Sequence, residues 1–597
     1  MKQFFGAFFG SIVGLLITGV IMALIIGAFI AAGLKGALSG IDEEKVITVK
    51  ENSVLHLKLE GPISERGLDN PFEELDLGPF MPEGTLGLRG IVKAIEAAKT
   101  DEKIKGIYLD IKDLQAGFAA TQEIRDAILD FKKSGKFVYS YSEIYSQKAY
   151  YLASAASKLY MNPQGGMELK GLSVQLMFFK NMLEKMQVEA QIFRHGKFKS
   201  AIEPFMLDKM SEANRLQTET YLNSMWGSML QGISEQRGTS IDKLNELANN
   251  LSIASPEDAL NNKLVDGLLY EDEVMNLLKK DLKLKEKDKI QFAEISKYEK
   301  KNRGGSLKGK LGKKPKMALI YAVGQIQGGE GDDETIGSDR IAKAIRDARL
   351  DTTIKAIVMR VNSPGGSALA SDVIWREVVL AKKVKPVVVS MGDVAASGGY
   401  YISCAADRIF AQPNTITGSI GVFGMLPNAQ KAFADKLGIN IDTVNTNKHS
   451  DIGTIFRPVN QQEFLYIQNS VEKVYETFIG RVAEGRKITT AQVDSIGQGR
   501  VWSGTDALKI NLVDELGGTD DAIAYAAKMA KMSDYKIEEF PKRKDPFSMF
   551  LNKGEEGLEE RIIQKQLGEQ YTYLKFVKRI MEFKGVQMRL PYEMIIN

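Results

Sequence analysis

Cysteine and histidine are almost missing from this 597-residue chain, which has one cysteine, Cys404, and three histidines. A single cysteine excludes an intrachain disulfide and any zinc or iron–sulfur site built from cysteines. His56, His195 and His449 are too few for a histidine-rich metal site, so we expect no metal and no cofactor. Any catalytic chemistry in this chain therefore depends on serine, lysine or carboxylate groups.

A strong excess of one charge sign is also missing. Lys and Arg number 79 and Asp and Glu number 76, which leaves a net charge of +3. A nearly balanced charge does not favour a nucleic-acid partner. With 44% hydrophobic and 26% charged residues, the composition is that of a globular protein, and the length exceeds that of one compact domain.

Formal charge is wholly missing from one long segment near the amino terminus. Residues 4–34 are a run of 31 uncharged residues, and a helix of that length exceeds the roughly 30 Å hydrocarbon core of a bilayer. A cleaved secretory signal has a shorter apolar stretch of about 7–15 residues. We therefore expect residues 1–40 to be a single membrane anchor, with a cleaved signal and a buried soluble helix as the less favoured alternatives. The flanking charges weakly favour a soluble body outside the cytoplasm.

The chain repeats itself at an offset of 250 residues. Residues 85–163 align with residues 335–413 without a gap, and 22 of the 79 columns are identical. A match that keeps its register over this length predicts two copies of one unit. We place the first repeat at residues 50–278 and the second at residues 317–535.

Short β-rich runs alternate with helical patterns inside each copy. In the second copy, residues 355–361 and 385–391 are nearly continuous apolar, β-branched runs, which are typical of strands buried on both faces. Residues 370–383 between them have helical spacing. This alternation predicts right-handed βαβ units, and hence an α/β fold of two tandem repeats with mainly parallel sheets.

Two segments lie outside the copies. Residues 279–316 carry 15 Lys or Arg against 5 Asp or Glu and end in a Gly- and Lys-rich stretch. This composition predicts a basic, exposed linker, with contact to anionic lipid or to a partner as the alternative. Residues 536–597 form a C-terminal extension, with a helical pattern over 555–583 and a strand-like finish over 586–588.

Two loops differ sharply between the copies. The second copy has NSPGGS at 362–367 and DVAASGGYY at 393–401, where the first copy has KDLQAG at 112–117 and EIYSQKAYY at 143–151. Duplicated units share their scaffold, so residues found in one copy only are candidates for chemistry.

The two loops of the second copy fit acyl transfer. Ser397 follows a strand and a small-residue turn and directly precedes a helical run. The amino terminus of a helix offers unpaired amides and a positive dipole end, which stabilise negative charge. Paired glycines let the backbone approach a ligand closely with its amides turned outward. One amide from Gly365 or Gly366 and one from Gly398 are therefore candidates to hold a tetrahedral oxyanion.

A serine nucleophile needs a base, and the residues alone do not identify it. His195 and His449 both lie in polar segments that are typical of loops. Lysine is the other candidate, but the chain has too many lysines for composition to choose one. The choice between histidine and lysine stays open at this point.

Taken together, the motifs resemble the signal peptide peptidase A (protease IV) family in its long, duplicated form. The resemblance rests on VNSPGG, DVAASGGYYI, TGSIGVFG and VWSGTDAL in the second copy and on FKSAIEPF in the first. It implies that the nucleophile is Ser397, in ASGGYY, and that the general base is Lys199, in KSAIEPF. Each repeat would then supply one half of a Ser/Lys dyad, with Glu203 as a local structural anchor and Cys404 as a buried helix residue.

The resemblance also implies a broader set of properties. The fold would be that of the ClpP/crotonase superfamily, and the assembly a homotetramer. The protein would be a single-pass protein of the bacterial inner membrane, with its body on the extracytoplasmic side, and would degrade cleaved signal peptides and other hydrophobic peptides. A solvated lysine has a pKa near 10.4, so a lysine that acts as a base at neutral pH needs a much lower pKa. Burial between the repeats would lower it.

Two other classes of function stay open. A crotonase-type acyl-CoA enzyme also uses paired amides to hold an oxyanion, but it has no nucleophilic serine. A membrane-tethered oligomeric scaffold or chaperone would carry the protease motifs as vestiges. Reaction of Ser397 with a fluorophosphonate discriminates a serine protease from both.

Overall fold

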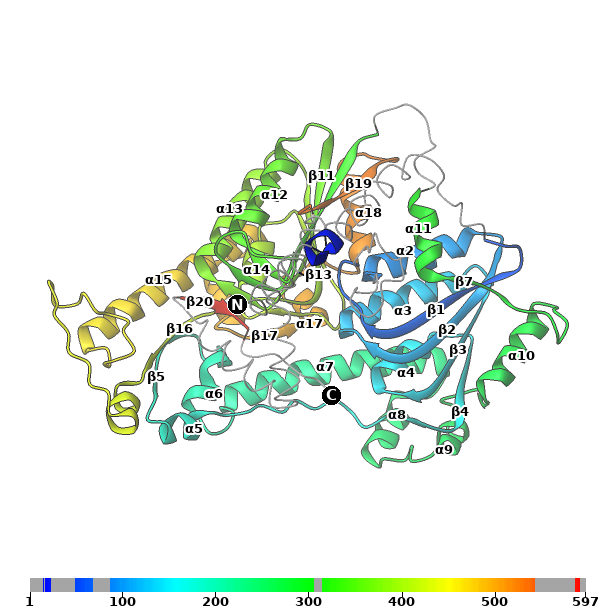
Figure 1. Ribbon diagram of the computed structural model, residues 1–597, viewed down its shortest axis with the longest axis horizontal. Helices are drawn as coiled ribbons and strands as arrows, with labels where there is room; N and C mark the ends of the chain where they lie inside the picture. The colour runs from blue at the N-terminus through cyan, green and yellow to red at the C-terminus, as the bar shows by residue number, and fades with distance from the viewer. Residues whose placement is uncertain are drawn as a thin grey trace, which may run out of the picture.

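The computed structural model describes residues 14, 17–22, 49–67, 86–304, 314–542 and 586–590 (Figure 1). The anchor predicted over residues 1–40 lies outside the described residues, apart from Gly14 and a helical stretch at 17–22. Within the described ranges, no helix has both the length and the apolar character that crossing a bilayer requires.

The first repeat is built on a six-stranded sheet whose neighbouring strands are all parallel, in the order β6-β4-β3-β2-β1-β7. The strands are β1 (Ser53–Pro62), β2 (Ile104–Gln115), β3 (Phe137–Tyr145), β4 (Lys158–Met167), β6 (Gly267–Leu268) and β7 (Gln291–Glu294). In β2, Ile107 and Leu109 pack in one apolar cluster, whereas Tyr108 packs in another. Both faces of the sheet are covered, which explains the continuous apolar runs in its strands.

The second repeat has a sheet of the same kind, in the order β17-β15-β13-β11-β8-β19, with β14 beside β13 and β18 beside β14. The strands are β8 (Lys316–Val323), β11 (Ile354–Ser363), β13 (Val387–Ala396), β14 (Arg408–Ala411), β15 (Ile416–Gly418), β17 (Val501–Ser503), β18 (Glu515–Leu516) and β19 (Lys536–Phe540). Its pairs are parallel except for β15 with β17. The prediction of mainly parallel sheets is confirmed.

Matching helices show the duplication directly. Helices α2 (Leu88–Thr100) and α3 (Phe118–Lys132) have counterparts in α12 (Ser338–Leu350) and α13 (Ala368–Lys382), 250 residues further along at both ends. Helix α4 (Gln147–Ala153) corresponds in the same way to α14 (Gly398–Ser403) within one residue. The sequence match therefore reflects two copies of one structural unit.

The remaining helices extend this scaffold. They are α5 (Lys180–Lys185), α6 (Glu203–Met206), α7 (Glu212–Arg237), α8 (Ile241–Asn249), α9 (Pro256–Asn261), α10 (Glu271–Asp281), α11 (Ile295–Gly304), α15 (Gln461–Arg486), α16 (Thr490–Ile496), α17 (Gly504–Lys509) and α18 (Thr519–Met529), with the short helices η2 (Ser200–Ile202) and η4 (Ala432–Lys436). Helix α7 runs along the lower side of the molecule in Figure 1 and contacts α4 of its own repeat and β17 of the other. It is one of the elements that tie the repeats together.

A third sheet combines strands from both repeats and from the C-terminal extension. Its order is β10-β9-β12-β20-β16-β5, with β5 (Glu189–His195), β9 (Gln325–Gln327), β10 (Thr335–Gly337), β12 (Gly365–Ser367), β16 (Val422–Asn428) and β20 (Gln587–Arg589). Strand β5 of the first repeat pairs antiparallel with β16 of the second along its whole length. The loop that follows β5 is thereby held against the second repeat.

Strand pairing in the structure runs past two of the predicted boundaries. The basic linker was expected over residues 279–316, but β7 inside that range extends the first sheet beside β1, and α11 packs against α2. The second repeat was expected to end at residue 535, but β19 pairs with β8 in its sheet. In both places a short amphipathic strand covers a sheet edge. Each strand has few apolar residues among many charged ones, so the sequence pattern does not identify it as a strand.

A buried arginine joins the two repeats. Arg360 of β11 is fully buried, and its Nε lies 2.8 Å from Oε2 of Glu65 and its Nη2 2.6 Å from Oε1 of Glu123. Both carboxylates belong to the first repeat, and burial raises the pKa of Glu123 to about 7. The two repeats are therefore joined by a desolvated charge cluster as well as by apolar contacts.

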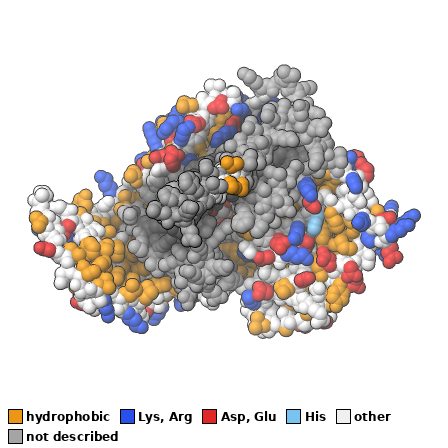
Figure 2. All heavy atoms as spheres, viewed as in Figure 1, with side chains coloured by type: hydrophobic (Ala, Val, Ile, Leu, Met, Phe, Trp, Pro, Cys, Tyr) orange, Lys and Arg blue, Asp and Glu red, His pale blue; other side chains and the backbone are white. Residues whose placement is uncertain are grey.

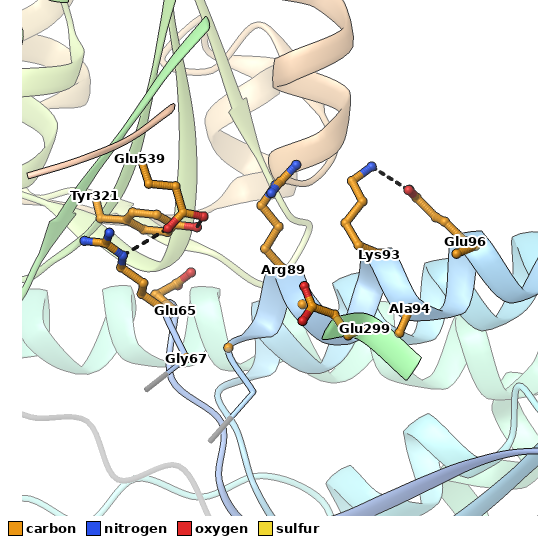
Figure 3. Close-up of a pocket in the computed structure, with 13 residues that line it drawn as sticks. Glu65, Gly67, Arg89, Lys93, Ala94, Glu96, Glu299, Tyr321 and Glu539 are labelled. Carbon is orange, nitrogen blue, oxygen red and sulfur yellow. Dashed lines mark hydrogen bonds and ion pairs between the residues drawn. The ribbon is translucent and has the colours of Figure 1, made fainter. Parts of the chain in front are cut away.

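A cavity of about 470 Å³ lies beside this cluster, at the junction of the repeats. Figure 3 shows Glu65 and Arg89 from the first repeat and Tyr321 and Glu539 from the second around it. Arg66 Nε donates to Glu539 Oε2 across it at 3.1 Å. The predicted catalytic residues are not among its lining residues, so this cavity belongs to the junction of the repeats.

Replacing Arg360 by alanine tests the charge cluster. Because two buried carboxylates would lose their cation, we expect Arg360→Ala to lower the free energy of unfolding by about 3–5 kcal/mol in urea denaturation. Arg346→Ala is the control, since the Arg346 side chain is half exposed where it pairs with Glu377, and its loss should be at most about 1 kcal/mol. Equal losses in the two variants would contradict the role given to Arg360.

Candidate active site

Ser397 stands at a sharp turn between β13 and α14. Its backbone has φ 55° and ψ −114°, a conformation that non-glycine residues seldom adopt. Its amide donates to the Gly418 carbonyl at 2.8 Å, and its carbonyl accepts from the Tyr401 amide at 2.8 Å. These bonds hold the strained turn and fix the direction in which the buried Ser397 hydroxyl leaves the backbone.

Lys199 lies four residues beyond the end of β5, in a loop that is held by the second repeat. The amide of Phe198 donates to the Gln498 carbonyl at 2.9 Å. Gln217 of α7 donates to the Phe198 carbonyl at 3.1 Å and accepts from the Val501 amide at 3.2 Å. The loop is therefore bound on both sides, and the Lys199 side chain is fully buried.

The structure brings Ser397 and Lys199 together within one chain. The distance from Lys199 Nζ to Ser397 Oγ is 2.8 Å. The same Nζ lies 3.0 Å from the hydroxyl and 3.2 Å from the carbonyl oxygen of Ser419. Two residues that are 198 positions apart, from different repeats, thus share one hydrogen-bonded group.

Burial controls the protonation of Lys199. Among the described residues no carboxylate forms an ion pair with Lys199, and burial lowers its pKa well below the ordinary value of 10.5. The charged amine loses its hydration without gaining a counter-ion, so the neutral form is favoured. A neutral amine has a lone pair that can accept a proton from a neighbouring hydroxyl.

Two glycines of the second repeat make room for the lysine. A Cβ on Gly499, which has φ +84°, would lie 2.5 Å from the Lys199 amide nitrogen. A Cβ on Gly421 would lie 3.2 Å from Lys199 Cδ. The close approach of the two repeats at the amine therefore depends on the absence of side chains at these positions.

The three glycines predicted to bind an oxyanion lie around Ser397. Gly398 follows the serine, and a Cβ built on it would lie 3.1 Å from Cα of Gly365. The amide of Gly365 donates to Ser363 Oγ at 3.1 Å, so it is engaged within its own loop. Gly366 lies in β12 and faces β20 in the ladder. Of the two alternatives from the sequence, the bond from the Gly365 amide to Ser363 favours Gly366.

Both histidine candidates are engaged elsewhere. His195 Nδ1 contacts Glu472, and its ring stacks on Tyr475 with 3.7 Å between the ring centroids. His449 Nδ1 lies 2.9 Å from Oε1 of Glu463. The group that contacts the serine is the lysine amine.

The two structural roles expected in the sequence agree with the geometry. Glu203 accepts from the Ser211 hydroxyl at 2.6 Å and from the Asn214 side-chain amide at 2.9 Å, at the start of α7. It therefore anchors the chain just after the lysine. Cys404 is buried at the end of α14.

Two residues with clear roles at the site were not predicted. Ser419 contacts the Lys199 amine with both its hydroxyl and its carbonyl oxygen. Asp393 accepts from the amides of Ala119 and Ala120, at the start of α3 in the other repeat. Both residues stand in motifs on which the family resemblance rests, TGSIGVFG and DVAASGGYYI, and those motifs were the available signal.

Comparison with known proteins identifies the family. The family model described as peptidase family S49 matches the chain twice, over residues 130–285 and 380–533. The chain belongs to peptidase family S49. The two matches fall one in each structural repeat, so each repeat is an S49 unit.

Curated relatives cover most of the chain. "Protease 4" of Salmonella typhi is 38% identical over 510 residues, which are 84% of this chain and 79% of that protein. "Protease 4" of Haemophilus influenzae is 35% identical over 79% of each chain. "Serine protease SPPA, chloroplastic" of Arabidopsis thaliana is 34% identical over 81% of this chain and 70% of that protein.

Among solved structures, a mutant of ClpP1 from Listeria monocytogenes aligns over 34% of this chain and 94% of its own. The identity is 16% and the TM-score is 0.24. A likeness of this size adds nothing to the description of the S49 repeats.

Gly499→Ala tests the space that the lysine needs. The new methyl group would push the Lys199 backbone away, and a misplacement of about 1 Å can cost roughly a hundredfold in rate, so we expect kcat for peptide hydrolysis to fall by about that factor. Gly453→Ala is the matched control, because Gly453 has φ +85° with nothing within 4 Å of its Cβ position. Both changes carry similar backbone strain, so equal kcat values would contradict the steric account.

Proposed function

We propose that this S49 serine peptidase is a membrane-bound endopeptidase with Ser397 as nucleophile and Lys199 as general base. The observation that carries the proposal is the 2.8 Å contact between Lys199 Nζ and Ser397 Oγ, both fully buried. Nucleophile and base at hydrogen-bond distance, with a third group orienting the base, are the arrangement that activates a serine hydroxyl. Ser419 is the orienting group.

The reaction follows from this geometry. The neutral Lys199 amine takes the Ser397 proton as Oγ attacks the peptide carbonyl carbon, and it then gives a proton to the leaving amine. The resulting acyl-enzyme is hydrolysed by water, with the same lysine as base. The contacts with Ser419 hold the amine in line with Oγ throughout.

The amides of Gly366 and Gly398 form the proposed oxyanion hole. The Gly398 amide comes directly after the nucleophile, and Gly366 lies on the strand beside it. The amide of Gly365 is the alternative to Gly366, but its bond to Ser363 would have to break. One such donor typically stabilises the transition state by about 3–4 kcal/mol.

The proposed substrates are hydrophobic peptides, signal peptides left after secretion among them. Support comes from the resemblance of the motifs to signal peptide peptidase A, and from relatives named "Protease 4" and "Serine protease SPPA". Residues 4–34, with no formal charge, would anchor the protein in the bacterial inner membrane with its body on the extracytoplasmic side. Peptides released from the membrane would then reach the site over a short distance.

A ClpP/crotonase-type fold and a homotetramer complete the proposal. An arm formed by β5, β16 and α15 projects from the second repeat, at the left of Figure 1. Figure 2 shows apolar side chains gathered at that end of the molecule. Exposed apolar residues there include Leu465 and Tyr466 of α15, and Leu437, Ile441 and Val444 of the segment between β16 and α15. A patch of this kind on a soluble surface is typical of a protein–protein interface, and the proposed partner is a second copy of this chain.

Substitution of either member of the proposed dyad tests the function. We expect Ser397→Ala and Lys199→Met each to lower kcat for peptide hydrolysis by roughly 10⁴-fold or more, because nucleophile and base act as a unit. A fluorophosphonate should label the parent at Ser397 and should label Lys199→Met far more slowly. Lys209→Met, at an exposed lysine, is the control and should behave as the parent. Full hydrolysis by either dyad variant refutes the proposal. So does a parent protein that the fluorophosphonate does not label, which is the result expected of an acyl-CoA enzyme or a scaffold.

The pH dependence tests the neutral amine. Because burial lowers the pKa of Lys199, kcat/KM should reach its plateau well below pH 10 and fall about tenfold per unit as the pH drops below that pKa. Between the lowered pKa of folded Lys199 and the value of about 10.4 in the unfolded chain, the unfolded chain binds one proton more than the folded chain. Burial of this amine therefore lowers stability most at low pH, and stability rises with pH across that window up to about 10.4. Lys199→Met should therefore have a higher Tm than the parent at pH 7, with a smaller difference at pH 10. A kcat/KM that keeps rising to pH 10, with no gain in Tm, would contradict the assignment.

A further inference from the structure

A stacked arginine lies close to the proposed base. Arg500 directly precedes β17, and its guanidinium carbon lies 4.2 Å from the ring centroid of Trp502 and 5.1 Å from that of Phe198. A guanidinium within about 6 Å of an aromatic ring is attracted to it. The half-buried Arg500 side chain is thus held by rings from both repeats.

Both rings are fixed in place. Trp502 Nε1 donates to the Ile496 carbonyl at 3.0 Å, and a Cβ on Gly418 would lie 2.8 Å from Trp502 Cδ1. Phe198 is 8% exposed and is held by its backbone bonds to the second repeat and to α7. The guanidinium therefore has a defined position, unlike that of a freely rotating surface side chain.

The backbone places this arginine next to the dyad. The Arg500 carbonyl accepts from the Ser419 amide at 2.7 Å, and the Ser419 hydroxyl contacts the Lys199 amine. Gly499, the preceding residue, packs against the Lys199 backbone. Phe198 comes directly before Lys199 in the other repeat. The arginine and its ring partner are thus one residue away from groups that touch the base.

Arg500 has no counter-ion among the described residues. Asp506 is the carboxylate whose charge acts on it, but Asp506 accepts from the Ser503 hydroxyl at 2.9 Å and from Lys509 Nζ at 2.9 Å. The buried Arg500 Nε has no hydrogen-bond acceptor in the described part of the chain. A buried donor without an acceptor is costly, and the planar donors of a guanidinium match a carboxylate.

Lys197 adds a second positive charge at the same ring. Its Nζ lies 5.1 Å from the ring centroid of Phe198, and its side chain is exposed. Within the described ranges, Lys197 also has no carboxylate at ion-pair distance. Two like charges around one ring repel each other, so an anion beside them is favoured.

The position beside the base indicates which part of a substrate this site meets. A general base passes its proton to the leaving amine, so residues that flank Lys199 lie along the segment that leaves. A signal peptide left after secretion ends in a carboxylate, which the cleavage of its precursor has created. An intact precursor has a peptide bond at the same place.

We propose that Arg500, assisted by Lys197, binds the C-terminal carboxylate of peptides that are cut close to their C-terminus. The site makes the enzyme selective for peptides already released by another peptidase over intact polypeptides. An acidic side chain in the leaving segment is the other source of the same chemistry. The inference rests on the proposed function, because it places the substrate at Ser397.

Matched peptides measure this preference in the active enzyme. The two substrates share one apolar sequence, with a short leaving segment that ends as the free acid or as the amide. A charge-assisted hydrogen bond changes affinity about tenfold or more. The parent kcat/KM should therefore favour the acid by about that factor, and Arg500→Gln should bring the ratio close to unity. Both substrates meet the same enzyme, so a loss of folded protein leaves the ratio unchanged. A parent ratio near unity, or a ratio that survives Arg500→Gln, would overturn the proposal.

Three further variants separate charge from packing. Arg500→Lys keeps the charge and should retain part of the preference. Lys197→Gln, at an exposed side chain, should reduce the ratio by a smaller factor than Arg500→Gln does. Arg481→Gln is the matched control, because Arg481 stacks on Trp375 with 3.7 Å between its guanidinium carbon and the ring centroid. It should keep the parent ratio, and an equal loss there would show that stacking is the cause.

Binding to the Ser397→Ala protein tests the site without turnover. Fluorescence anisotropy of the two labelled peptides should give a Kd about tenfold lower for the acid, and adding Arg500→Gln should remove the difference. A product bound with its carboxylate at the proposed oxyanion glycines would also favour the acid. That preference would survive Arg500→Gln and would contradict the assignment. If the parent hydrolyses neither peptide, the proposed function fails, while the Kd values still report on the Arg500 site.

Amide-capped peptides with Asp or Asn in the leaving segment distinguish the two sources of carboxylate. We expect the Asp peptide to gain less than the terminal acid does at every position of the segment. An Asp preference that equals the acid preference and is lost in Arg500→Gln would refute the assignment to the C-terminus.

Discussion

The site depends on one desolvated amine. Lys199 Nζ is buried between the repeats with two hydroxyls and one carbonyl as its partners and, among the described residues, no carboxylate ion-paired with it. A solvated lysine would be protonated at neutral pH and could not accept the Ser397 proton. In the proposed mechanism, removal from water makes it a base, and the closed interface between the two repeats removes it from water.

This constraint explains why the chain keeps two copies of one unit. The first repeat supplies the amine and the second supplies the hydroxyl, and neither half provides both. The pairing of β5 with β16, the glycines beside Lys199 and the buried cluster around Arg360 all act to hold one repeat against the other. Asp393 links the strand that leads to Ser397 with the first turn of α3. In the proposed mechanism, stability and catalysis thus use the same interface.

Much of the fold could be predicted from the sequence, because local patterns carry it. Buried parallel strands have continuous apolar runs, and the match at an offset of 250 aligns α2 and α3 with α12 and α13 to the residue. The serine and its glycines stood out because only one copy has them. Lys199 could not be predicted in this way, because periodicity gives no reason to choose one lysine among many. Only the family motif pointed to it.

What the sequence did not predict are contacts between distant segments. The pairing of β5 with β16 joins residues more than 200 positions apart, and no local pattern records such a partner. Serine is a common residue, and Ser419 matters only because the fold places its hydroxyl beside the Lys199 amine. The strand-like finish at residues 586–588 was visible as a pattern, but its place beside the oxyanion loop depends on the folded second repeat.

The most direct test of the central claim is a titration of the Lys199 amine itself. Lysine ¹³Cε chemical shifts, recorded as a function of pH on the folded protein with Lys199→Met to assign the signal, report its protonation without any turnover. The account predicts one lysine that titrates far below the others and that is missing from the variant. If the Lys199 signal titrates near pH 10.4 with the solvated lysines, the amine is charged at neutral pH and the account is wrong.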